Sequence, residues 1–140
     1  MTAQRIRALT AFCLALASMA IGAGPALPRG RNTIVLVVPK RVRQHRSYDI
    51  SISGLALHKA KAYLFVDYGR CAASFAAESR IAVGESVEYT VAGAFVKISG
   101  WQTSLIEPGA PVQSDHACAY LVKPLTGHVL AAAKATFAVH

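Results

Sequence analysis

The segment Asp115-His116-Ala117-Cys118-Ala119-Tyr120-Leu121-Val122 is short, apolar and rich in residues that favour β-strands. It contains one of the two cysteines that we expect in the mature protein. The other, Cys71, follows a second apolar run over residues 62–68. A disulfide between Cys71 and Cys118 would staple a small all-β domain, and the expected fold is built around this pair.

The first 26 residues have the three parts of a secretory signal peptide. Two arginines, Arg5 and Arg7, precede an uncharged apolar run over residues 11–23, and small residues follow it. The strongly apolar part is about 13 residues long, whereas a bilayer-spanning helix needs about 20. We therefore expect a signal peptide at residues 1–26, cleaved after Ala20 or Ala26, with an uncleaved anchor as the alternative. The mature protein is then secreted or displayed at the cell surface.

The remaining chain is long enough for one domain with a modest core. We predict a linker at residues 27–32 and a single domain at residues 33–140. The formal net charge of the 140 residues is +8, and the two arginines of the signal peptide contribute two of these charges. A basic surface favours anionic neighbours such as phospholipid or acidic wall polymers, but it also serves solubility alone.

Alternation of apolar and polar residues predicts several strands. The clearest is residues 47–53, where Tyr48, Ile50 and Ile52 share one face and Gly54 follows. Further strand-forming runs cover residues 33–38, 61–68, 86–91, 95–99, 116–123 and 135–139, whereas residues 129–133 suit helix or strand. For residues 72–79 we expect a short helical turn or a crossing loop. We predict an all-β fold, a two-sheet antiparallel β-sandwich of about seven strands.

Two cysteines in an exported domain are expected to be bonded, because compartments outside the cytoplasm are usually oxidising. The pair encloses about 48 residues, for which the chain-entropy model gives roughly 4 kcal/mol of stabilisation. A free reactive thiol and metal ligation are the alternatives. Since neither C-x-x-C nor histidines at metal-ligand spacing occur, we predict no metal and no cofactor.

Motifs of the common catalytic classes are missing from the sequence, including G-x-S-x-G, H-E-x-x-H and the Walker phosphate loop. Asp115 and His116 are neighbours, so on a strand their side chains point to opposite faces and make a poor catalytic pair. Trp101, the single tryptophan, suits the core better than a ligand platform. We predict a non-catalytic module, with a small hydrolase whose site the fold assembles as the third hypothesis.

The densest charge lies in residues 40–46. Its cations are Lys40, Arg41, Arg43 and Arg46. Functionally, this run would form a strip that binds anionic cell-surface polymers or membrane, extended by Arg29 and Arg31. The alternative is that this run is only a solvated loop, whose charges prevent an edge strand from pairing with another strand. Because no aromatic residues are interleaved with the cations, nucleic acid is not the expected ligand.

These features resemble a small secreted bacterial β-sandwich of the Ig-like or fibronectin-like kind. The resemblance is carried by the export segment, the alternating runs 48–53 and 87–91, the Cys71 and Cys118 pair, and the late strand 115–120. Immunoglobulin domains place a tyrosine two residues before the second cysteine, whereas Tyr120 follows Cys118 here. The resemblance implies adhesion or ligand display. The expected partner is an extracellular protein or an anionic cell-surface polymer.

Overall fold

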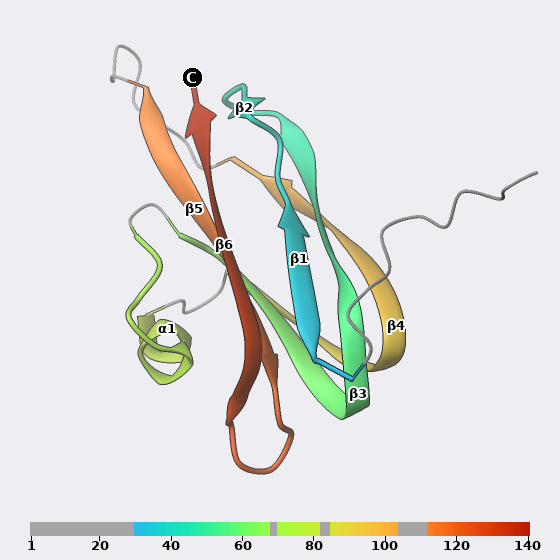
Figure 1. Ribbon diagram of the computed structural model, residues 1–140. Helices are drawn as coiled ribbons and strands as arrows, with labels where there is room; N and C mark the ends of the chain where they lie inside the picture. Colours follow the sequence, from blue (N-terminus) through green and yellow to red (C-terminus); the bar gives the residue numbers. More distant parts are fainter. Residues whose placement is uncertain (1–29, 68–69, 82–84, 104–111) are drawn as a thin grey trace, which may run out of the picture.

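The structure is built around one long strand that takes part in both halves of a curled sheet (Figure 1). The computed structural model describes residues 30–67, 70–81, 85–103 and 112–140. Its elements are β1 (Thr33–Val37), β2 (Arg41–Val42), β3 (Ser47–Asp67), α1 (Phe75–Ile81), β4 (Ser86–Gln102), β5 (Gln113–Val122) and β6 (Val129–Val139). The predicted signal peptide, both cleavage sites and Arg29 lie outside the described residues. Within them, no helix is long and apolar enough to cross a membrane.

The strands form one six-stranded sheet in the order β1-β3-β5-β6-β2, and β4 pairs with β3. The prediction of an all-β fold is confirmed. The finer prediction of two antiparallel sheets with about seven strands is not confirmed. β2 runs parallel to β6, so the sheet is not purely antiparallel. β3 pairs with β4 on both sides of the bend, so the strands remain in one continuous sheet and do not divide into two.

Two segments expected to end strands lie inside strands instead. Gly54 lies within β3, where a Cβ would stand 2.1 Å from the carbonyl oxygen of Thr33 on β1. Glycine is therefore required by a close backbone approach and does not mark a turn. Residues 92–94, which separate the expected strands 86–91 and 95–99, lie within β4. The ambiguous residues 129–133 are strand, as part of β6.

β3 and β4 bend together at a bulge. The register shifts between Ala56 and Ala60 of β3, opposite the part of β4 in which Gly93 adopts a φ of 68°. Bulges bend a strand and strengthen its twist. Because the sheet curls here, its inner faces meet around the main core. The largest buried side chains of this core are Ile50, Ile52, Leu64, Leu121, Phe137 and Val139. Trp101 is half-buried and packs against it.

We expect Gly54→Ala to lower the free energy of unfolding by about 1–3 kcal/mol, as overpacking typically does. The atoms that a Cβ would meet belong to the backbone of β1, so they cannot move aside without separating β1 from β3. Gly100→Ala is the matched control, because its Cβ would meet a side-chain atom of Asp49 at 3.7 Å. Urea unfolding measures both variants. Equal losses of stability would contradict this account of Gly54.

Candidate functional site

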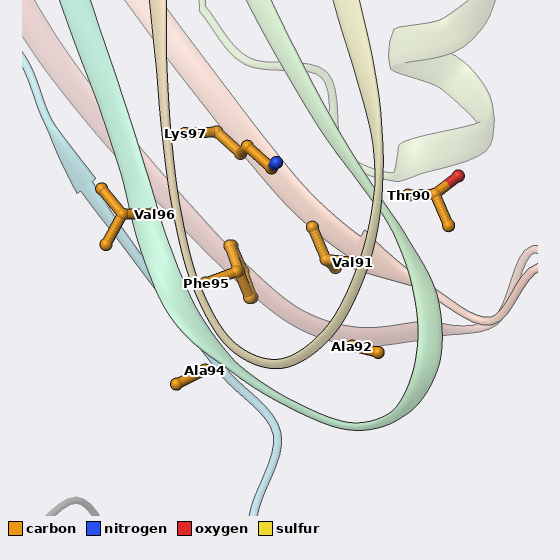
Figure 2. Close-up of a pocket in the computed structure, with 7 residues that line it drawn as sticks. All are labelled: Thr90, Val91, Ala92, Ala94, Phe95, Val96 and Lys97. Atoms are coloured by element: carbon orange, nitrogen blue, oxygen red, sulfur yellow. The ribbon is translucent and has the colours of Figure 1, made fainter.

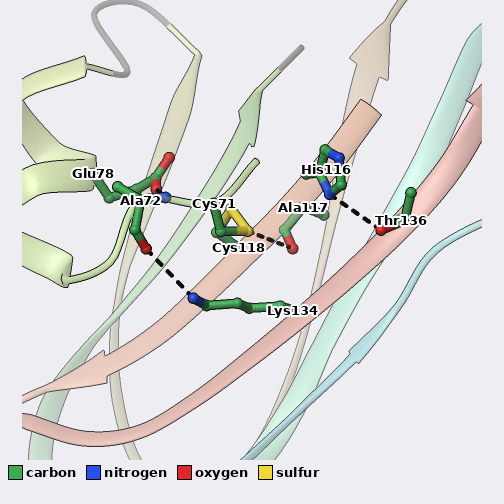
Figure 3. The surroundings of a disulfide bond; sticks show 8 residues. All are labelled: Cys71, Ala72, Glu78, His116, Ala117, Cys118, Lys134 and Thr136. Carbon is green, nitrogen blue, oxygen red and sulfur yellow. Dashed lines mark hydrogen bonds between the residues drawn. A yellow bond between two sulfur atoms is a disulfide. The ribbon is translucent and has the colours of Figure 1, made fainter. Parts of the chain in front are cut away.

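A disulfide joins Cys71, just before α1, to Cys118 in the middle of β5 (Figure 3). The two Cα atoms are 5.8 Å apart. Two further interactions hold the segment that follows Cys71. The Lys134 ammonium donates to the carbonyl of Ala72 at 3.4 Å, and the Glu78 carboxylate accepts the N–H of Ala72. The bond therefore fastens the segment that carries α1 to the outer side of the sheet.

Beneath α1, aromatic side chains form a second, smaller core on the outer face of β3 and β5. Its rings are Tyr63, Phe65, Phe75 and Tyr120, which we call the aromatic cluster. Phe75 is the contribution of α1, and its ring centroid lies 4.9 Å from that of Tyr63 and 5.5 Å from that of Tyr120. The Ser74 hydroxyl caps the helix by accepting the N–H of Ala77 at 3.2 Å. The predicted helical turn is thus a short capped helix.

Two buried polar atoms beneath α1 have no hydrogen-bond partner among the described residues: Oε1 of Glu78 and the hydroxyl of Tyr120. Burial raises the pKa of Tyr120, and the negative charge of Glu78 raises it further. Both side chains are enclosed, since Glu78 has no exposed surface and Tyr120 almost none. A ligand could reach them only if α1 moved away.

Asp115 and His116 point to opposite sides of β5, as the sequence predicts. Asp115 is 3% exposed and accepts a hydrogen bond from the Gln113 amide at 2.9 Å. His116 lies on the outer side, 3.1 Å from the hydroxyl of Thr136. The structure does not bring the two together. Across the described ranges, no three His, Cys, Asp or Glu side chains form a group that would hold a metal ion.

The predicted basic strip is divided by the fold. Lys40, Arg41, Arg43 and Arg46 are exposed on the loop around β2, whereas Arg31 lies at the opposite end of β1. The loop has a defined shape, because buried Val42 anchors it and His140 donates to the Val42 carbonyl at 3.0 Å. None of the four cations forms a salt bridge within the described part of the chain. They form one exposed cluster, which we call the β2 loop cations.

A second exposed surface is apolar and was not singled out by the sequence. On the outer face of β1, β3 and β4, two cross-strand rows pass from a valine on β1 over a serine on β3 to an apolar residue on β4. They are Val37, Ser51 and Ile98, and Val35, Ser53 and Val96. The exposed fractions of Val96 and Ile98 are 67% and 65%. We call Val35, Val37, Val96 and Ile98 the outer apolar face.

The outer apolar face and the aromatic cluster lie on the same side of β3. Odd-numbered residues of β3 occupy this side both before the bulge, as in Ser51, and after it, as in Phe65. α1 covers the second half, but no described element covers the first. A hollow of about 300 Å³ lies on the uncovered half, lined by Val35, Ser53, Gly54, Ala94, Phe95 and Val96.

β4 is the edge strand at the border of this face. It pairs with β3 on one side, and none of the other described strands pairs with its second side. At its bend, a further hollow of about 290 Å³ is lined by residues 90–92 and 94–97 (Figure 2). The ammonium of Lys97 projects there and lies 5.8 Å from the centre of the Tyr89 ring. β4 is long, at 17 residues, and it bends opposite the bulge of β3. The bend and Lys97 limit which strands can pair with this edge.

Comparison with known proteins assigns no family to this chain. No family model and no curated protein sequence matches it. Among solved structures, a superoxide reductase (neelaredoxin) from Ignicoccus hospitalis aligns over 83% of this chain and 87% of its own, with 12% sequence identity and a TM-score of 0.43. A TM-score below 0.5 does not establish a shared fold.

We expect Asp115→Asn to stabilise the protein at neutral pH. Burial raises the pKa of Asp115, so the folded state favours its neutral form and ionisation at higher pH opposes folding. The neutral Asp115 side chain therefore stabilises the folded state at low pH. This contribution is lost as the pH rises through the raised pKa of Asp115. Asparagine removes this cost and keeps an acceptor for Gln113.

Urea unfolding of both proteins at a series of pH values measures the difference. The two stabilities should converge below about pH 4, where aspartate is protonated even in the unfolded chain. A variant that is less stable than the wild type at pH 7 would show that ionised Asp115 is favourable in the fold.

Proposed function

We propose that this protein is an exported, non-catalytic β-module that binds a protein partner outside the cytoplasm through the outer apolar face. One observation carries the proposal: Val35, Val37, Val96 and Ile98 are each at least half exposed, on the half of the sheet that α1 leaves uncovered. Clustered apolar side chains at a surface commonly mark a binding site. Export is supported by the N-terminal sequence and by the disulfide, which suits an oxidising compartment.

The free edge of β4 suggests how such a partner is held. An extended segment that adds to an exposed edge gains backbone hydrogen bonds, while pockets for alternate side chains supply specificity. Val96 and Ile98 stand on β4 itself, and Val35 and Val37 stand two strands away. A chain paired with β4 therefore contacts Val96 and Ile98 directly, and a partner that extends over β3 also reaches Val35 and Val37.

A photo-crosslinking residue in place of Ile98 tests the proposal in cells that export the protein. We expect a crosslinked product outside the cytoplasm, and we expect Val37→Ser, on the same face, to reduce its yield several-fold. The matched control carries the same crosslinker in place of Arg80, which is exposed on α1. Equal products from both positions, or none from Ile98, would contradict the proposal.

A second candidate function is binding of anionic cell-surface polymers by the β2 loop cations. The observation that favours it is that all four are exposed on a loop of defined shape and are not neutralised by any described carboxylate. Clustered cations attract polyanions over a range set by the Debye length, which is about 30 Å at 0.01 M salt and about 8 Å at 0.15 M.

We expect the protein to bind long-chain polyphosphate at about 0.01 M salt and to release most of it at about 0.15 M. Arg43→Gln/Arg46→Gln should weaken this binding several-fold. Arg70→Gln/Arg80→Gln changes the net charge equally at another part of the surface, where both arginines are exposed, so it should have little effect. Fluorescence anisotropy of labelled polyphosphate measures all three proteins. Equal losses in both double variants would show that net charge, and not the loop, determines binding.

A further inference from the structure

A leucine protrudes from the end of the molecule opposite β2. Leu125 lies at the tip of the hairpin that joins β5 to β6, at the bottom of Figure 1, and is 99% exposed. The turn is closed by a hydrogen bond from the N–H of Lys123 to the carbonyl of His128 at 2.8 Å, and Gly127 adopts a φ of 67°. Leu125 therefore lies on a hydrogen-bonded turn, and none of the described residues packs against its side chain.

The bulge of β3 brings a lysine to the same end. Its side chains are turned outward, so Leu57, His58 and Lys59 are all exposed. The Asn32 side chain accepts the N–H of Leu57 at 2.9 Å, which ties the bulge to the start of β1. Between the bulge and the hairpin lies a hollow of about 260 Å³. It is lined by Asn32, His58, Lys59, Lys123, Pro124 and Leu130.

This hollow combines two lysines with an apolar floor of Pro124 and Leu130. None of the described carboxylates lines it, and neither Lys59 nor Lys123 forms a salt bridge with one. Glu88 is already paired with Lys61. The end of the molecule is therefore positively charged and exposes two leucines, Leu57 on the bulge and the fully exposed Leu125 on the hairpin.

We propose that this end docks on an anionic phospholipid bilayer, with Leu125 entering the boundary between headgroups and acyl chains while Lys59 and Lys123 contact lipid phosphates. Apolar insertion beside basic residues is how peripheral proteins bind such surfaces. A polyanion is a less suitable ligand for this end, because it offers no apolar environment for the Leu125 side chain. A stable protein interface buries about 800 Å² on each partner, more than a narrow hairpin tip presents. The inference uses neither the outer apolar face nor the β2 loop cations, so it stands apart from both functions proposed above.

Vesicle flotation with the chain recovered after export tests this inference. Wild type should float with vesicles of phosphatidylglycerol and phosphatidylcholine, and not with phosphatidylcholine alone. Leu125→Ser should lower the partition coefficient about tenfold, because it removes the inserted side chain. Lys59→Gln/Lys123→Gln should lower it about fivefold for each lysine. Arg70→Gln/Arg80→Gln is the matched control, because it removes the same charge from two exposed arginines that neither proposal uses, and it should float like wild type. Intact mass measurement checks that all variants share one N-terminus, so that any contribution of the N-terminal segment to vesicle binding is the same in each.

Three results would overturn the inference: wild type that does not bind anionic vesicles, Leu125→Ser that floats like wild type, or an equal loss in the Arg70→Gln/Arg80→Gln control. Polyphosphate binding separates lipid docking from general anion binding. Leu125→Ser should keep its affinity for polyphosphate while it loses vesicles, and a parallel loss of both would also count against insertion. Because Leu125 is exposed, its replacement should leave the thermal unfolding midpoint unchanged, which confirms that each variant is folded.

Discussion

The bond between Cys71 and Cys118 decides which half of the sheet is covered on its outer side. α1 has seven residues, and a helix of that length is marginal in water when isolated. It stays on the sheet because Cys71 is tied to β5 and Phe75 packs among the rings of the aromatic cluster. A bridge between residues 47 apart is worth roughly 4 kcal/mol in the chain-entropy model, against a net stability of about 5–15 kcal/mol for a typical domain.

A second constraint is the shared bend of β3 and β4, which organises both the core and the surface. The bulge between Ala56 and Ala60 lets one sheet curl until its inner faces meet, and the same bulge turns His58 and Lys59 outward at one end. The loop around β2 places a separate group of cations at the other end. The exposed features thus occupy three distinct regions: two basic ends and the outer apolar face between them.

The sequence predicted those features that depend on composition and local alternation. The paired cysteines, the all-β fold, the short helix and the opposite orientations of Asp115 and His116 all follow from such rules. It did not predict that β3 is continuous, because Gly54 permits a close backbone approach here and a glycine that closes a strand looks the same in sequence. In residues 33–38, apolar side chains alternate onto both faces of the strand, which is typical of a strand buried on both faces. Only the fold shows that Val35 and Val37 are exposed. Arg31 and Lys40 are close in sequence, but extended β1 lies between them.

Hydrogen–deuterium exchange of the exported protein, with and without a thiol reductant, tests most directly whether the disulfide holds α1 over one half of the sheet. We expect the amides of α1 to lose their protection on reduction, because the helix is then held on the sheet only by Phe75 and by the hydrogen bond from exposed Lys134 to Ala72. The amides that pair β1 with the first half of β3 should keep theirs, since that pairing does not involve the disulfide. Unchanged protection of α1, or an equal loss throughout the sheet, would contradict the account.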